Sequence, residues 1–197
     1  RGTTIKNPAD FVIGTLRQME AEFPLNFPLE HYHACYKLNE YMSEMQMDIL
    51  DPPNVAGWSA YYQAPEFYLK WLNTATYTTR NSFAKTILKQ GIYSANGSIR
   101  VNSPHLIHKI TLLQGQDVNQ IIETCCTLFL PVAISTTQKQ YLKDILLQGL
   151  PDSEWTIEWL QYLPYALFDD NPNTYAIRNK LDTFLIELMS MAEYQLI

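Results

Sequence analysis

The hydrophobic positions of this chain recur at helical spacing over most of its length, with caps and prolines between the periodic stretches. Asn7 followed by Pro8 has the form of a helix cap with proline in the first turn, and the apolar residues that follow fall on one face. A second helix is expected over about residues 29–47. Further helix starts are predicted at Pro65, Asn73 or Thr74, Ser103, Asp117, Ser135 or Thr136, Asp152 and Asn171.

One stretch breaks the helical pattern, between residues 92 and 101. Two short apolar runs flank Ala95-Asn96-Gly97, and Asn-Gly between apolar runs is a strong signal for a hairpin. The connections between the expected elements are short, and no repeat, low-complexity tract or linker divides the chain. The sequence therefore predicts one all-α domain, residues 1–197, built as a compact multi-helix array with one short β-hairpin near residues 92–101.

Composition and charge narrow the classes of partner. The net charge of −6 and the pI near 5.1, without a basic cluster, argue against nucleic acid and against an anionic membrane surface. Charged residues make up 17% of the chain, below the roughly 25% of typical soluble domains, which favours an envelope or extracytoplasmic protein. No apolar run reaches the ~18 residues that a transmembrane helix needs. Because the chain starts at Arg1, we expect a longer protein with any targeting signal upstream.

The most constrained stretch runs from Asp51 to Trp58. The two prolines after Asp51 hold the backbone extended, Asn54 can bond its own backbone in a turn, and Gly57 accepts a positive φ. This turn aims Trp58 in one direction. We assign a structural role to the residues of this turn and of the helices that follow: Asp51, Pro52, Pro53, Asn54, Gly57, Trp58, Trp71, Asn73 and Arg80.

These residues also carry a family resemblance. The runs at 52–58 and 71–76, with Arg80 and Phe83, resemble the signature of the bacterial "domain of unknown function 1800" family. Residues 5–17 are similar to the segment just upstream of that signature, 60–65 resemble an insert of Bacteroidetes-type members, and 193–196 resemble the closing phrase. The resemblance is motif-specific over residues 1–90 and looser beyond. It implies the C-terminal part of a longer protein and, through the secretion signals common in the family, a periplasmic or envelope location. It implies no chemistry.

Six aromatic residues lie between positions 58 and 71. One interpretation is a stacking platform for sugar rings. For that role we select a tyrosine pair in the expected loop and the polar residues near it as ligand-binding candidates: Tyr61, Tyr62, Asn54 and Gln63. The other interpretation, which we favour, is core packing, because Phe67 and Trp71 share a helical face and Trp58 can dock beside them.

The charged residues within the signature are Asp51 and Arg80. A guanidinium offers five donors in a rigid fork. We therefore expect Arg80 to bond Asp51 or the carbonyl groups of the turn, as a structural link.

Metal, cofactor and redox chemistry have little support in the sequence. The pair His31 and His33 and the pair His105 and His108 lack a carboxylate at a recognised metal-binding spacing. The adjacent cysteines at 125 and 126 lie on an expected buried helix and are interpreted as small apolar residues. We expect no metal and no cofactor.

Catalytic motifs are also absent, and the catalytic residues, if any exist, are unknown. No Gly-x-Ser-x-Gly elbow or glycine-rich phosphate loop occurs. Glu154 and Glu158 lie four apart beside two tryptophans, and on one helix they would not face each other across a glycoside. Asp169 and Asp170 are interpreted as a helix start rather than a calcium loop.

Two functions remain open. The favoured one is a non-catalytic binding or assembly module of a secreted or envelope bacterial protein, which contacts the missing N-terminal part, an envelope protein or a glycan. The alternative is a hydrolase of an envelope or dietary polymer whose site is shared with the missing N-terminal part. A concave pocket with converging titratable groups would favour the enzyme, and an aromatic or flat surface the binding module.

Overall fold

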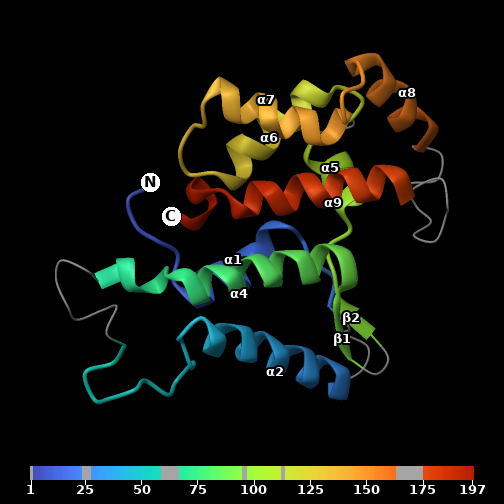
Figure 1. Cartoon of the computed structure of the whole chain (residues 1–197). Helices are drawn as coiled ribbons and strands as arrows, with labels where there is room; N and C mark the ends of the chain where they lie inside the picture. Colours follow the sequence, from blue (N-terminus) through green and yellow to red (C-terminus); the bar gives the residue numbers. More distant parts are fainter. Residues whose placement is uncertain (1, 24–27, 59–66, 95–96, 112–113, 163–174) are drawn as a thin grey trace. The chain divides into compact units, whose positions relative to one another are not determined.

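The computed structural model describes residues 2–23, 28–58, 67–94, 97–111, 114–162 and 175–197. Within these ranges the fold is all-α apart from one short hairpin, which confirms the predicted class (Figure 1). Two compact units make up the chain: unit 1 is Arg1–Val101 with Gln195–Ile197, and unit 2 is Asn102–Tyr194. The expected single domain over residues 1–197 stays a prediction. No helix in the described ranges has both the length and the apolar character that a membrane span requires.

Unit 1 is built from helices that pack on the outer helix α2. Helix α2 contacts α1, α4 and both strands of the hairpin (Figure 1). The described elements of this unit are α1 Pro8–Gln18, α2 Pro28–Glu44, a 3₁₀ turn Phe67–Trp71, α4 Thr74–Lys85, a π-helical turn Thr86–Gln90, β1 Ile92–Ser94 and β2 Gly97–Ile99.

Local capping explains where the helices of unit 1 begin. The Asn7 side chain accepts a hydrogen bond from the backbone N–H of Asp10 at 2.9 Å, and Pro8 occupies the first turn of α1. Asn73 and Thr76 form a capping box at the start of α4, each side chain bonding the backbone of the other. Both predicted caps are confirmed.

The predicted hairpin is also confirmed. Strands β1 and β2 pair antiparallel with Ile92 opposite Ile99 and Ser94 opposite Gly97. Gly91 ends the preceding π-helical turn with a φ of 81°, a left-handed conformation that a side chain would strain. Its N–H donates to the carbonyl of Thr86 at 2.6 Å, which closes that turn before the strand begins.

Unit 2 consists of helices gathered around α9. Helix α9 packs against α5, α7 and α8, and α6 packs against α7 and α8. The described elements are α5 Ser103–Ile110, α6 Val118–Phe129, α7 Thr136–Leu147, α8 Asp152–Tyr162, α9 Tyr175–Ser190 and a final 3₁₀ turn Ala192–Gln195. The caps predicted at Asp117 and Ser135 are confirmed, while the stop expected at Pro164 and the start expected at Asn171 lie outside the described residues.

One predicted cap is wrong. The Asn102 side chain, not that of Ser103, caps α5 by accepting from the backbone N–H of His105 at 3.3 Å. The Ser103 hydroxyl instead donates to the carboxylate of Asp182 on α9 at 2.5 Å, and both side chains are buried. A buried carboxylate needs a hydrogen-bond donor, and the Ser103 hydroxyl supplies one to Asp182. The serine side chain therefore bonds to α9 instead of capping α5.

Unit 2 is centred on two stacked indole rings. Trp155 and Trp159 lie 5.9 Å apart between ring centroids, and the Trp155 Nε1–H donates to the carbonyl of Gly115 at 2.9 Å. A Cβ on Gly115 would lie 2.3 Å from the Trp159 ring, so only glycine fits here. Cys125 and Cys126 are buried, as predicted, and burial raises the pKa of Cys126 to about 11, which keeps that thiol protonated at neutral pH.

Candidate functional site

The turn at residues 51–58 has the local chemistry that its sequence predicts. The Asn54 side-chain oxygen accepts a hydrogen bond from the N–H of Ala56 at 2.8 Å, and the Asn54 carbonyl accepts from the N–H of Gly57 at 2.9 Å. Gly57 has a φ of 94°. These bonds close the turn directly before Trp58 and fix the direction in which its side chain leaves the backbone.

Trp58 packs against the buried residues beneath the turn. It lies against Met47 and Trp71, and Trp71 is only 3% exposed. Ile5 and Tyr68 pack on the same cluster. The expected placement of Trp58 beside Trp71 is therefore confirmed, and one part of the indole remains accessible because Trp58 is only partly buried.

The predicted bond from Arg80 to Asp51 or to the carbonyl groups of the 51–58 turn is wrong. Arg80 is fully buried, and its guanidinium donates to the carbonyl of Lys6 at 2.7 Å and to that of Trp71 at 3.3 Å. It also donates to the side-chain oxygen of Gln195 at 3.1 Å. The structural role is as expected, but the link joins the start of the chain, the aromatic turn and residue 195 rather than the turn at 51.

Neutral hydrogen-bond acceptors and the aromatic ring of Phe11 stabilise the charge of Arg80. Its guanidinium carbon lies 4.7 Å from the centroid of Phe11, within the range of a cation–π contact. Burial lowers the pKa of Arg80 to about 10, and burial together with the charge of Arg80 lowers the pKa of Lys6 to about 8. Arg80 is charged at neutral pH, and Lys6 titrates closer to neutrality than an exposed lysine does.

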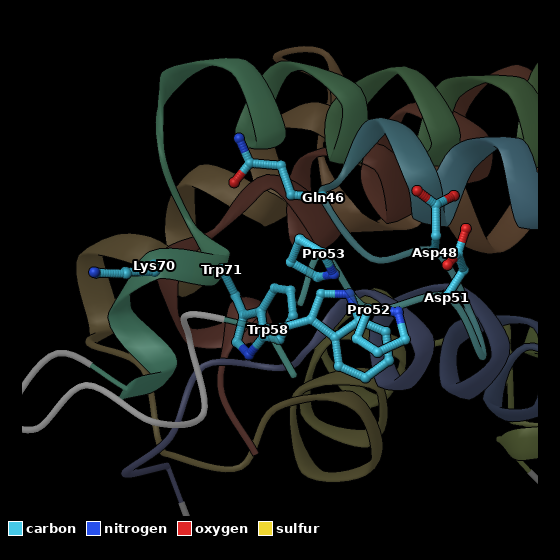
Figure 2. A pocket seen from close by; sticks show the side chains of 8 residues that line it. All are labelled: Gln46, Asp48, Asp51, Pro52, Pro53, Trp58, Lys70 and Trp71. Atoms are coloured by element: carbon cyan, nitrogen blue, oxygen red, sulfur yellow. The ribbon is translucent and has the colours of Figure 1, made fainter. Parts of the chain in front are cut away.

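A pocket of about 570 Å³ opens beside this cluster (Figure 2). Its centre is aromatic and rigid, formed by Trp58, Trp71 and the two prolines of the turn. The polar side chains that complete the lining are those of Gln46, Asp48, Asp51 and Lys70. All eight residues belong to unit 1.

The two carboxylates of the pocket lie on one side of it. Asp48 and Asp51 belong to one turn, in which the N–H of Asp51 donates to the carbonyl of Asp48 at 3.2 Å. Figure 2 shows both carboxylates on the same side of Trp58, with the amine of Lys70 on the other side. Neither carboxylate has a hydrogen bond or an ion pair with any residue that the structure describes, so both are available to a ligand.

The backbone around Asp48 is unusual. Gln46 has a φ of 73° and Leu50 a φ of 67°, so two residues other than glycine adopt the left-handed conformation on either side of it. Residues other than glycine adopt this conformation infrequently. At Gln46 it closes helix α2, because the N–H of Gln46 donates to the carbonyl of Ser43 at 2.7 Å and the N–H of Met47 donates to that of Met42 at 2.9 Å. The two left-handed residues turn the chain out of α2 and bring Asp48 to the pocket wall.

Of the residues selected from sequence as ligand-binding, the structure describes one. Asn54 is exposed in the turn and is not part of the pocket lining, and Tyr61, Tyr62 and Gln63 lie outside the described residues. Of the lining residues, Gln46, Asp48 and Lys70 were missed by the sequence analysis. The spacing of Asp48 three residues before Asp51 was the one signal that could have pointed to the pair.

The chain matches the family described as "Protein of unknown function (DUF1800)" over residues 1–196. It belongs to this family. The match extends past the signature region into all of unit 2, so both units are part of the family's conserved extent. Among curated proteins and solved structures, none matches the chain. Neither a Bacteroidetes-type origin nor a C-terminal position follows from the family match.

The other candidate residues of this DUF1800 protein were selected for metal or catalytic chemistry, and Asp169 and Asp170 lie outside the described residues. No group of three or more His, Cys, Asp or Glu side chains in the described ranges is arranged to hold a metal ion. His31 contacts Cys35 along α2, with Nε2 and Sγ 3.7 Å apart. Glu158 forms a part-buried ion pair with Lys180 on α9, at 2.5 Å.

Proposed function

We propose that this protein is a carbohydrate-binding module that holds a sugar ring in the Trp58 pocket. The observation that carries the proposal is a cavity of about 570 Å³ in which an indole face stands beside two carboxylates, an amide and an amine. Small-ligand sites commonly combine an aromatic or apolar floor with a few polar groups that fix orientation.

Each lining group has a task in this proposal. A sugar ring has an apolar C–H face, which packs on the negative face of an indole such as Trp58. The carboxylates of Asp48 and Asp51 accept hydrogen bonds from neighbouring hydroxyls, and Gln46 both donates and accepts. The prolines and the bonds of Asn54 hold the turn in place before binding, which lowers the entropy lost on association.

Binding is favoured over hydrolysis by the position of the carboxylates. Glycosidases place two carboxyl groups on either side of the scissile bond, separated by ~5–9.5 Å. Asp48 and Asp51 instead share one turn and one side of the pocket, opposite Lys70. This geometry suits the recognition of hydroxyl groups and does not suit an acid and a nucleophile that act from opposite sides.

The proposed setting is a secreted or envelope protein of a Bacteroidetes-type bacterium, in which this chain is the C-terminal part. The resemblance of residues 52–65 and the charged fraction of 17% support it. Leu50 and Val55 project almost fully exposed from the segment that bears the pocket. We propose that they contact the missing N-terminal part of the same protein, because covering their exposed apolar surface would be favourable.

The test is a glycan array followed by calorimetric titration of the strongest hit. Trp58→Ala is expected to weaken binding at least tenfold, equivalent to about 1.4 kcal/mol. Asp51→Asn keeps the size of the side chain, so it separates the loss of an acceptor charge from the loss of folding. The matched control is Tyr175→Ala, an exposed aromatic residue of unit 2. An array without hits, or a hit that survives both pocket variants, would exclude this function.

A further inference from the structure

A second cavity adjoins the Trp58 pocket on the outer side of helix α2. It measures about 480 Å³, and its lining includes Tyr36, Asn39, Glu40, Ser43, Glu44 and Asp48. Asp48 also lines the Trp58 pocket. The two cavities therefore lie next to each other and share one lining side chain, and we call the pair the α2 groove.

Aromatic residues extend the groove along α2. Tyr36 is 52% exposed, and Tyr32, one turn earlier, is 63% exposed. Positions 32, 36, 40 and 43 share one face of the helix, opposite the buried positions 34, 38 and 42 that pack against the rest of unit 1. This face therefore carries exposed tyrosine rings together with polar side chains that line the second cavity.

The charges of the groove are mainly negative. Lys37 is already paired with Glu40, at 2.5 Å. The side-chain carboxylates of Asp48, Asp51 and Glu44 have no hydrogen bond or ion pair with any residue in the described ranges. Among the described lining residues of the two cavities, the cations are Lys70 and Lys37, the latter paired with Glu40, and they are outnumbered by four carboxylates, those of Glu40, Glu44, Asp48 and Asp51. Such a groove repels uronic acids and sulfated sugars and attracts a ligand that carries protonated amines.

We propose that the ligand is an oligosaccharide of amino sugars with free amines, which binds from the Trp58 pocket across Asp48 to Tyr36. This inference rests on the proposed carbohydrate binding and adds the length and the charge of the ligand. An amine placed at the junction of the two cavities meets the carboxylate of Asp48, while neighbouring rings stack on Trp58 and Tyr36. A peptide is a poorer fit, because the groove wall is a helix without a strand edge and its lining is polar.

The experiment compares two series of defined probes by calorimetric titration of the whole chain. One series is glucosamine oligomers from the monomer to the hexamer, and the other is the same oligomers with every amine acetylated. We expect affinity in the first series to rise about tenfold or more from dimer to hexamer, because a second subsite is reached. We expect the acetylated hexamer to bind at least about tenfold more weakly, and added salt to reduce the difference.

Variants locate the two ends of the ligand. Tyr36→Ala is expected to reduce the affinity of the glucosamine hexamer to that of the dimer and to leave the dimer unchanged, whereas Trp58→Ala weakens both. Tyr175→Ala, an equally conservative change at an exposed tyrosine of unit 2, leaves both unchanged. Glu44→Gln retains the shape of the groove and is expected to weaken the hexamer alone.

The outcomes separate this inference from the proposed function. If short and long oligomers bind equally through Trp58, or if acetylated oligomers bind as well as free amines, the α2 groove proposal is overturned and carbohydrate binding in the pocket stands. If neither series binds and a broad glycan array shows no hit, the pocket function itself is excluded.

Discussion

Replacing Arg80 by alanine is expected to destabilise the protein by about 4 kcal/mol. The guanidinium makes three hydrogen bonds, to the carbonyls of Lys6 and Trp71 and to the side chain of Gln195. Bonds from a charged donor are worth about 1.5–3 kcal/mol each, or about 7 kcal/mol together. The variant also recovers the free energy lost in burying the charge, about 3 kcal/mol from a pKa lowered to about 10.

Urea unfolding followed by circular dichroism measures this loss, with the slope of the transition as a check on the unfolded reference. Arg17→Ala is the matched control, since Arg17 is an exposed residue of α1 and its removal is expected to change stability by less than about 0.5 kcal/mol. Arg80→Lys keeps the charge but not the planar fork, so it is expected to recover less than half of the loss. A change below about 1 kcal/mol for Arg80→Ala would show that its three acceptors find other partners, and the argument would be refuted.

Three further predictions concern stability. Because the unfolded chain keeps the Lys6 proton up to about pH 10.5 and the folded protein releases it near pH 8, wild-type stability rises across that interval. Lys6→Met removes the buried charge, so the variant is expected to be more stable than the wild type at neutral pH. This difference in the free energy of unfolding is expected to shrink by up to about 3 kcal/mol as the pH rises to about 10.5, measured by parallel urea titrations. A difference that stays constant with pH would contradict the prediction. Gly115→Ala is expected to cost about 2–3 kcal/mol in thermal melts, since the new Cβ meets Trp159 at 2.3 Å. Gly14→Ala, with open space around its Cβ, is expected to stabilise α1 by about 0.5–1 kcal/mol. If the melting temperatures of Gly115→Ala and Gly14→Ala shift by the same amount in the same direction, the steric explanation is overturned. Asn73→Ala is expected to lower stability by about 1 kcal/mol through loss of the α4 cap, and an unchanged urea midpoint would show that the cap contributes nothing.

Helix starts could be predicted from sequence where their cause is local. The caps at Asn7, Asn73, Asp117 and Ser135 each depend on a side chain that bonds backbone two or three residues away. The hairpin at residues 92–99 is local in the same sense, because its signal lies in the residues between the two strands. Such features need no knowledge of the rest of the fold.

Partners distant in sequence could not be predicted. Arg80 donates to an acceptor 115 residues away, and Ser103 donates to a carboxylate 79 residues away. The prediction for Arg80 therefore named the wrong partner, and the prediction for Ser103 named the wrong role. The pocket shows the same limit. Its aromatic half was visible in the turn sequence, whereas the approach of Lys70 to that turn depends on tertiary packing.

The segment at the far end of the chain has a consequence for synthesis. The backbone of Lys6 and Gln195 pairs at 2.7 Å, Ile5 bridges Leu196, and Gln195 supplies an acceptor to Arg80, so residues made after unit 2 belong to unit 1. At the usual ribosomal rate, the intervening stretch of residues 102–194 takes roughly 5–20 s to translate. Until Gln195 is made, a nascent unit 1 lacks one acceptor of the Arg80 guanidinium, so this buried cation has one hydrogen bond fewer than in the complete protein.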